Sequence, residues 1–286
     1  MDEIVKIAIQ KSGRLSENTL ALLKDCGIKV SSVQNRLKER AANFPAEVLF
    51  LRDDDIPEYV QDGVADIGIV GQNVLVEKAK NVEETEKLGF GKCRLSLAVS
   101  KNEEYKSLSF FNGKRIATSY PLLLKNFLDK NKISATIHEI SGSVEIAPGI
   151  GLAEGICDIV SSGSTLFSNG LKEVETVFQS EAVLVTNKNL SAGKRKILDQ
   201  LIFRIRSVNN AKNNKYILLN IPNEKLEKII SILPGMKSPT VLPLAEKGWS
   251  SVHSVINEEK FWEIIEQLKD NGAQGILVVP IEKMIV

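Results

Sequence analysis

The sequence predicts an α/β protein in which a two-lobed core is followed by a smaller C-terminal module. Strand and helix patterns alternate from the first residues, which is typical of a sheet covered by helices. The alternation runs through two successive series before a polar, asparagine-rich break at Val208–Lys215, the best linker candidate in the chain. A compact third series comes after this break. We therefore expect three structural parts, of which the first two form one core.

The first two series are expected to form two similar lobes. The strands of the first series are expected at Ile4–Ile9, Val48–Leu51 and Ile67–Val70, and its helix at Leu15–Cys26. The second series has expected strands at Leu95–Val99, Arg115–Thr118, Thr136–Ile140 and Ile156–Val160, and a helix after Pro121. A strand at Ala182–Thr186 and a helix at Ala192–Ser207 should return the chain to the first lobe. Lobe I is thus predicted at 1–95 and 185–208, and lobe II at 96–184.

The third series predicts a ferredoxin-like module at 210–286, because its order is β-α-β-β-α-β. Its strands are expected at Tyr216–Ile221, Thr240–Leu244, Val252–Ile256 and Gly275–Val279, and its helices at Glu224–Leu233 and Glu258–Asp270. Small modules of this type often bind regulators, an inference from fold analogy.

One short pattern occurs in both lobes. Gly63-Val-Ala-Asp66-Ile-Gly-Ile-Val-Gly71 and Gly155-Ile-Cys-Asp158-Ile-Val-Ser-Ser-Gly163 share G-x-x-D-I-x-x-x-G. Each would be the end of a helix, a strand and a glycine turn. Ligands of such folds bind at the carboxyl ends of the strands, which here means between the lobes.

Composition excludes several classes of function. The chain has 286 residues with 37 basic and 36 acidic side chains, and a net charge of +1 gives no signal for nucleic acid or membrane. The N-terminus is not a signal peptide, and no apolar run is long enough to span a bilayer. The three cysteines, Cys26, Cys93 and Cys157, are isolated and indicate reduced thiols in a cytoplasmic protein. Two histidines make a histidine-based zinc site or a Ser-His-Asp triad improbable.

The segment Asp158-Ile-Val-Ser-Ser-Gly-Ser-Thr-Leu166 is the most informative motif. Small residues after an apolar strand let the backbone approach a ligand, and N–H groups and hydroxyls there can hold an anion. Thr165 could cap or open a following helical turn. Asp158 would repel a bare phosphate but could accept hydrogen bonds from sugar hydroxyls, which suggests a phosphorylated sugar. The alternative is an ordinary strand–turn–helix corner, and the motif alone leaves both open.

Cationic residues follow several predicted strands. Lys11, Gly13 and Arg14 follow the first strand, Arg52 follows the second, and Arg94 lies beside a later one. Such charges are usually solvated, but strand ends converge on one crevice, where several cations would suit a substrate with more than one phosphate. Glu145 could pair with Asp158 on two ribose hydroxyls. It could equally be a first-turn glutamate favoured by a helix dipole.

Together these motifs resemble ATP phosphoribosyltransferase, in the long form with a C-terminal regulatory domain. The resemblance extends through nearly the whole chain, in the family's order. It is carried by Lys11–Leu15, Arg52–Pro57, Gly63–Gly71, Cys93–Leu95, Ala117–Pro121, Ser141–Pro148, Asp158–Leu171 and Leu233–Thr240. Small departures exist: Ser162 stands where the family usually has threonine, Ser12 replaces a residue that is often basic or small, and Asp53–Asp54 make the second motif more acidic.

The resemblance implies a periplasmic-binding-protein-like core and the first step of histidine biosynthesis. ATP and phosphoribosyl pyrophosphate would give N1-(5-phosphoribosyl)-ATP and pyrophosphate, with Mg²⁺ carried mainly by substrate phosphates and no dedicated protein ligands. Asp158, Lys11 and Arg14 would be catalytic. The phosphoribosyl pyrophosphate site would comprise Glu145, Asp158, Ser161, Ser162, Gly163, Ser164 and Thr165, and the ATP and pyrophosphate side Lys11, Gly13, Arg14, Arg52 and Arg94.

The resemblance also implies feedback inhibition by histidine and a homohexamer in equilibrium with a dimer. The expected histidine site comprises Asn220, Leu233, Pro234, Gly235, Ser238, Pro239, Thr240 and His253. Without the resemblance, the proline-rich turn would be taken for a simple loop closure. Two other functions are weighed: a two-lobed cytosolic binding or sensor protein without catalysis, and a phosphoribosyltransferase for another base.

Overall fold

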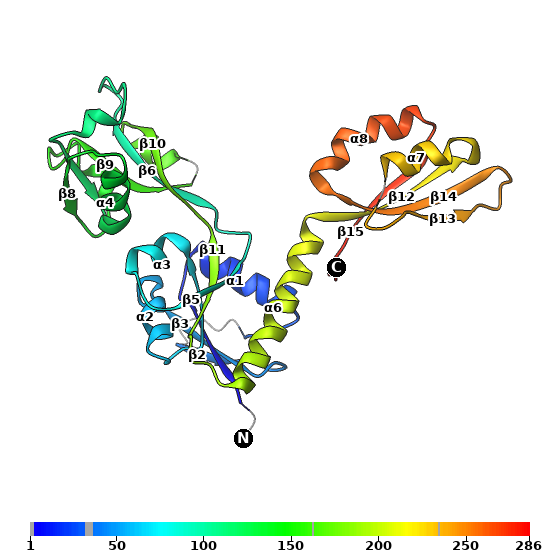
Figure 1. Ribbon diagram of the computed structural model, residues 1–286, viewed down its shortest axis with the longest axis horizontal. Helices are drawn as coiled ribbons and strands as arrows, with labels where there is room; N and C mark the ends of the chain where they lie inside the picture. The colour runs from blue at the N-terminus through cyan, green and yellow to red at the C-terminus, as the bar shows by residue number, and fades with distance from the viewer. Residues whose placement is uncertain (1–2, 32–36, 162, 234) are drawn as a thin grey trace. The chain divides into compact units, whose positions relative to one another are not determined.

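The computed structural model describes residues 3–31, 37–161, 163–233 and 235–286 (Figure 1). These residues fall into two compact units, one within Met1–Lys24 and Ile28–Leu198, the other within Asp25–Gly27 and Asp199–Val286. The first unit contains two sheets, which define lobe I and lobe II, and the second contains one. Among the described residues, no helix combines the length and the apolar character needed to cross a membrane.

Lobe I is built on a mixed sheet with the strand order β2-β3-β1-β4-β11-β5. Its strands are β1 (Val5–Gln10), β2 (Lys38–Arg40), β3 (Ala46–Leu51), β4 (Ile67–Gly71), β5 (Glu83–Lys87) and β11 (Ala182–Thr186), and its helices α1 (Arg14–Asp25), α2 (Ile56–Gln61) and α3 (Gln72–Lys78). Strand β1 runs parallel to β3 and β4, and β11 runs antiparallel to β4 and β5. A Cβ at Gly68 would lie 2.7 Å from Ile56 Cγ2, so glycine there lets α2 pack closely on the sheet.

Lobe II has the strand order β10-β6-β9-β7-β8. It comprises β6 (Cys93–Ser100), β7 (Arg115–Thr118), β8 (Thr136–Glu139), β9 (Gly155–Val160), β10 (Leu171–Ser180), α4 (Pro121–Lys130) and the short α5 (Ser164–Ser168). Strand β7 runs parallel to β8 and β9. Fully buried Phe111 lies against Gly155, where an added Cβ would come within 2.7 Å of the ring.

The chain leaves lobe I once and returns once. It leaves through β6 and returns through β10, and these strands pair antiparallel along their length, with Cys93 opposite Ser180 (Figure 1). The return strand β11 then joins the lobe I sheet. Lobe I is therefore assembled from two separate stretches of chain.

The second unit has the ferredoxin-like order β13-β14-β12-β15. It comprises β12 (Asn214–Pro222), α7 (Leu226–Ile232), β13 (Thr240–Pro243), β14 (Trp249–Asn257), α8 (Glu258–Asp270) and β15 (Gln274–Pro280). Burial alternates along β12, with Ile217, Leu219 and Ile221 in the core, which is the period of a strand covered on one face. The Asn257 side chain accepts from Glu259 N at 3.0 Å and caps α8. The predicted fold class is confirmed.

The predicted linker is wrong. Helix α6 runs without interruption from Ala192 to Lys212, and β12 begins at Asn214. Asparagine is a weak helix former, but buried Val208 and Ala211 hold the last turns of the helix, so packing outweighs propensity. The pattern also gave no indication of β2, β5, β10 or α3, whereas the helix expected to end at Gly63 is α2.

The repeated G-x-x-D-I pattern does not mark equivalent positions. Asp66 precedes β4 at its amino end, accepts Lys6 N at 2.8 Å and pairs with Lys194 Nζ at 2.8 Å. Asp158 lies within β9, near its carboxyl end. The two stretches are thus shifted relative to their strands, and only Asp158 lies at the end where ligands bind.

An ion pair in lobe II provides a stability test. Arg115 donates to Glu154 from its side chain and from its backbone N–H, and lowers the pKa of the Glu154 carboxyl from 4.5 to about 2. Because the folded pKa is the lower one, the stabilisation is complete above the unfolded pKa and is lost as pH falls toward the folded pKa. We expect Glu154→Gln to lower Tm by a few degrees at neutral pH, since both groups are partly exposed. The Tm difference from wild type should shrink between pH 5 and pH 3; a constant difference over that range would contradict this account.

Candidate active site

The carboxyl ends of the parallel strands border a cavity of about 430 Å³ in the first unit. Both lobes contribute to its lining through the segments that follow β3, β7 and β8, together with one face of α3. The lining residues are Arg52, Asp53, Asp54, Val74, Glu77, Lys78, Ser119, Tyr120, Glu139, Ile140, Ser141 and Gly142. This is the location expected for a ligand in a parallel α/β fold.

Asp158 is a partly buried carboxylate on β9. Burial raises the pKa of Asp158 above its ordinary value, and the nearby charge of Glu145 raises it further. Glu145 lies in the 3₁₀ turn Val144–Ile146, so the structure brings the two predicted carboxylates together. No ion pair is recorded for Asp158 within the described part of the chain. A desolvated carboxylate in that situation is stabilised by hydroxyl donors from a ligand.

The predicted anion loop follows β9 directly. Gly163 has φ +81°, a conformation that favours glycine, and occupies the N-cap position of α5. Thr165 is the second residue of α5, so of the two alternatives expected for it, it lies in the opening turn of a helix and is not the cap. Ser161, Ser164 and Thr165 are exposed, while Leu166 anchors the turn in the core. Ser162 lies outside the described residues.

Arg94 lies beside this loop, on lobe II. It forms a two-pronged ion pair with Glu173, with Nε–Oε1 and Nη2–Oε2 distances of 2.5 Å, and donates to Ser161 O at 3.4 Å. Ser96 donates to the same carboxylate, and these contacts lower the pKa of Glu173, the bond from Arg94 being the largest cause. The Arg94 charge is therefore already neutralised, which suits support of the loop better than capture of a free phosphate.

The remaining predicted cations lie together in lobe I. Lys11 N donates to Leu51 O at 2.7 Å, which holds the segments after β1 and β3 side by side. Lys11, Arg14 and Arg52 are exposed, and no hydrogen bond or ion pair is recorded for their side chains among the described residues. Gly13, with φ +93°, makes the turn into α1. These three cations therefore lie at the same end of the lobe I sheet, where β1 and β3 finish.

Sequence reasoning gave no role to Tyr120, which lines the cavity. Burial raises the pKa of Tyr120, and the charges of Asp158 and Asp53 raise it further. Its hydroxyl accepts a hydrogen bond from Asn73 Nδ2 at 3.2 Å. Carboxylates from both lobes therefore influence the ionisation of Tyr120. Its only sequence signal was the family-like Ala117-Thr-Ser-Tyr-Pro121 motif.

The residues predicted to bind histidine are divided by the sheet of the second unit. On the sheet face that the helices do not cover, His253 of β14 lies between Thr240 of β13 and Leu218 of β12. On the same face, Asn220 of β12 lies opposite Ser251 of β14. His253 Nδ1 lies 2.9 Å from Tyr216 Oη, and its Nε2 lies 3.0 Å from Ser251 Oγ.

The turn residues of the predicted set lie elsewhere. Leu233 is in the core on the other face, and a Cβ at Gly235 would lie 2.9 Å from buried Ser254 Oγ. Ser238 is exposed, Pro239 is buried, and Pro234 lies outside the described residues. The described residues of the predicted set therefore do not lie together at one place in the domain. Tyr216 and Ser251, missed from sequence, accompany His253 instead.

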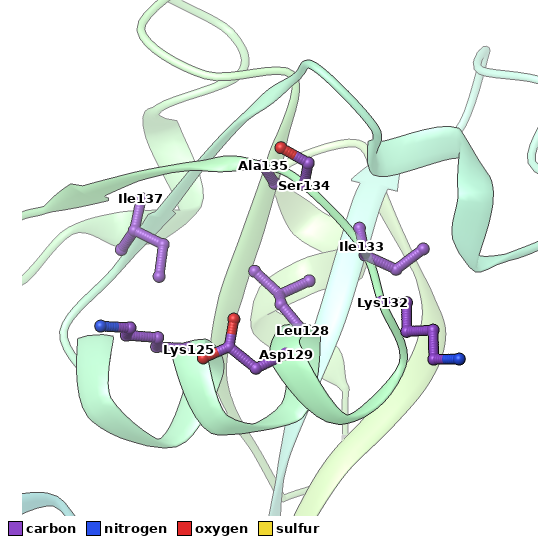
Figure 2. Close-up of a pocket in the computed structure, with 8 residues that line it drawn as sticks. All are labelled: Lys125, Leu128, Asp129, Lys132, Ile133, Ser134, Ala135 and Ile137. Atoms are coloured by element: carbon purple, nitrogen blue, oxygen red, sulfur yellow. The ribbon is translucent and has the colours of Figure 1, made fainter.

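A second hollow on lobe II does not belong to this site. Its volume is about 450 Å³. Figure 2 shows the residues that line it: Lys125, Leu128, Asp129, Lys132, Ile133, Ser134, Ala135 and Ile137. It lies beside the segment that enters β8, at the opposite end of the strand from the cavity. Among the described residues, no group of three or more histidine, cysteine, aspartate or glutamate side chains could hold a metal ion.

Comparison with known proteins agrees with the geometry. The family model of ATP phosphoribosyltransferase (HisG) matches residues 52–207, and the model "HisG, C-terminal domain" matches residues 211–283. An ATP phosphoribosyltransferase from Cytophaga hutchinsonii is 61% identical over 285 residues, covering 100% of both chains. An ATP phosphoribosyl transferase (HisG:HisZ) complex from Thermotoga maritima has a TM-score of 0.60 and 29% identity, covering 71% of this chain and 99% of that one.

The core fold is shared with more distant proteins. A periplasmic sulfonate-binding protein from Methylobacillus flagellatus KT has a TM-score of 0.51 and 15% identity, covering 72% of this chain and 68% of that one. At this identity the likeness concerns the fold alone.

Proposed function

The chain belongs to the ATP phosphoribosyltransferase family, and we propose that its two lobes divide the substrates of the reaction between them. The enzyme transfers the phosphoribosyl group of phosphoribosyl pyrophosphate to N1 of ATP, in the first step of histidine biosynthesis. Such a reaction needs separate places for the 5-phosphate, the leaving pyrophosphate and the ATP phosphates, because like charges repel one another when they are crowded together.

Lobe II holds the phosphoribosyl group. Ser161–Thr165 bind the 5-phosphate through backbone N–H groups and hydroxyls, and Asp158 and Glu145 accept hydrogen bonds from the ribose hydroxyls. The observation that carries this assignment is the partly buried Asp158 carboxylate, with its raised pKa, directly before an exposed loop of small residues. Arg94 keeps the loop in place through Ser161 O.

Lobe I holds the leaving pyrophosphate and the ATP phosphates. Lys11, Arg14 and Arg52 supply positive charge at the ends of β1 and β3, with Gly13 allowing close approach of the backbone. Mg²⁺ is held mainly by the substrate phosphates, because it keeps several waters and needs few protein ligands. Asp53 and Asp54, which line the cavity, would contact its waters. When bound, Mg²⁺ neutralises charge on the leaving group.

The chemistry needs no covalent nucleophile. Adenine N1 attacks ribose C1 as pyrophosphate leaves, so positive charge grows on the ribose and negative charge on the leaving group. In this arrangement Asp158 would face the first charge, and Lys11 and Arg14 would face the second. The rate enhancement then comes from positioning and from fixed charges. Detection of the ATP adduct by absorbance, with pyrophosphatase present, distinguishes this enzyme from a two-lobed binding protein.

The domain at 210–286 is the regulatory domain, through which histidine inhibits the enzyme. The open sheet face supplies Asn220, Thr240 and His253, which offer donors and acceptors for an amino acid, with Tyr216 and Ser251 beside His253. The edge strand β15 exposes Leu277, Val278 and Val279, which supports self-association of the chain. The family resemblance extends this to a homohexamer in equilibrium with a dimer. The isolated, unbridged cysteines of the chain suit a cytoplasmic protein.

Asp158→Asn should reduce kcat/KM by roughly one to three orders of magnitude, because it removes a charge that acts mainly in the transition state. The measurement is steady-state kinetics on a protein with a wild-type melting curve. Unchanged kcat/KM would rule out the assignment of Asp158.

Glu145→Gln tests the role of the Asp158 carboxylate in a second way, through its pKa. The Glu145 charge raises the pKa of Asp158, so its removal lowers that pKa. The acid limb of the kcat/KM profile should therefore move to lower pH. A limb that stays in place or moves upward would show that Asp158 does not control it.

Gly163→Val should abolish binding of phosphoribosyl pyrophosphate, because a β-branched residue is strained at φ +81° and would occupy space proposed for the phosphate. Gly170→Val is the matched control: Gly170, after α5, has a similar φ of +69° and similarly open surroundings, but lies outside the proposed phosphate loop. We expect calorimetry to find at least tenfold weaker binding for Gly163→Val only. Equal affinities for the two variants would move the phosphate site elsewhere.

Thr240→Ala should raise the histidine concentration needed for half-inhibition severalfold, within a coupling of about 1–3 kcal/mol. Thr176→Ala, at an exposed threonine of β10, is the control and should leave inhibition unchanged. If millimolar histidine alters neither the rate nor the sedimentation of the full-length enzyme, the regulatory assignment is wrong.

A further inference from the structure

Helix α4 of lobe II has the acceptors for its first turn in lobe I. The first N–H groups of a helix have no partner within the helix, and Pro121, at the start of α4, has no N–H at all. The next two donors are satisfied by Glu77 of α3: Leu122 N donates to Oε1 and Leu123 N to Oε2, both at 2.9 Å. A carboxylate at this end of a helix is also favoured by the helix dipole.

A second set of hydrogen bonds lies beside this contact. Asn73, one turn earlier on α3, donates from Nδ2 to Tyr120 Oη at 3.2 Å. Its backbone N–H donates to Ser180 Oγ at 3.0 Å, and that hydroxyl donates to Asn73 Oδ1 at 2.8 Å. Asn73 and Ser180 are both buried, and a buried network whose members are satisfied is rigid. Ser180 ends β10, the strand that returns the chain to lobe I.

These contacts adjoin the cavity. Glu77 and Tyr120 both line it, from α3 and from the segment before α4 respectively. The N–H groups of Leu122 and Leu123 in the first turn of α4 therefore both find their acceptors only at one particular separation of the two lobes. The same separation sets the distance between the cations after β1 and β3 and the loop after β9.

We propose that Glu77 is a positioning residue for phosphoribosyl transfer, which fixes the spacing of the two lobes by capping α4 across them. The inference rests on the proposed division of substrates between the lobes. Each lobe would still bind its own phosphate groups without Glu77, but the attacking nitrogen and ribose C1 would no longer be held in line. A displacement of about 1 Å can reduce a rate by about a hundredfold.

The test is Glu77→Gln in the full-length enzyme, because glutamine keeps the shape but offers one acceptor for two N–H groups. We expect kcat to fall 10- to 100-fold, as roughly expected for misplaced reactants, while calorimetry gives a Kd for phosphoribosyl pyrophosphate within about threefold of wild type. Hydrogen exchange at the Leu122 and Leu123 amides should accelerate at least tenfold. The control is Glu154→Gln. The Glu154 carboxylate also accepts a backbone N–H, but both partners lie within lobe II. The kcat of this variant should stay at the wild-type value.

An unchanged kcat in Glu77→Gln overturns the proposal, as does a loss of kcat equal to that of Glu154→Gln. Should Glu77→Gln not fold, Tyr120→Phe breaks the neighbouring bond to Asn73 without a change of volume. It should then accelerate the same amide exchange and lower kcat, and unaltered exchange overturns the proposal. Failure of the substrate assignment itself would appear separately, as normal binding by Gly163→Val.

Discussion

Strand β11 is the element on which the rest of the first unit depends. Its residues Ala182–Thr186 are all buried, and it pairs with β4 on one side and β5 on the other. Without β11, the lobe I sheet would lack the strand that joins these two neighbours. Because β11 follows β10 in the chain, lobe I cannot be completed until lobe II has been traversed. Such non-local pairing brings both ends of lobe II to the same place and fixes the two crossings between the lobes.

Some charged side chains of the first unit have an ion partner within the protein, and others have none recorded among the described residues. Asp66 pairs with Lys194, and Arg115 pairs with Glu154. Arg94 pairs with Glu173 in the same way, beside the loop that follows β9. The second group includes residues at or near the carboxyl ends of strands. There Lys11, Arg14, Arg52 and Asp158 have no recorded ion partner among the described residues, and a substrate that carries phosphates and hydroxyls would supply the missing partners.

Much of the fold could be predicted, because apolar periodicity marks buried elements. The bounds of β7, β11 and α8 agree with the predicted ranges. The missed strands β2 and β5 read Lys-Glu-Arg and Glu-Glu-Thr-Glu-Lys, and lie at the two edges of the sheet, where charged residues remain solvated and no alternation appears. The break at Val208–Lys215 was misread because composition does not reveal the tertiary contacts that bury Val208.

The site was predictable to the extent that each residue follows a strand. The convergence of Lys11, Arg14 and Arg52 follows from parallel neighbours, and the pairing of Glu145 with Asp158 was one of two readings left open. The partners of Arg94 could not be predicted, since Glu173 is 79 residues away. Glu77 and Tyr120 were missed for the same reason: their contacts join lobes that the sequence shows only as separate series. The histidine set was predicted as one group because motif proximity does not say which face of a sheet a residue occupies.

Two-lobed folds can hold their lobes apart until a ligand joins them, and this chain instead has contacts between the lobes that use no ligand. Phosphoribosyl pyrophosphate carries phosphates at both ends, so in the proposed arrangement it would span from the loop at Ser161–Thr165 to the cations of lobe I. If the substrate had to order the lobes itself, part of its binding energy would be spent on that ordering. The Glu77 cap on α4 and the Asn73–Tyr120 bond would meet this requirement before binding. More of the substrate's binding energy would then remain for the charges that develop as the bond to pyrophosphate breaks.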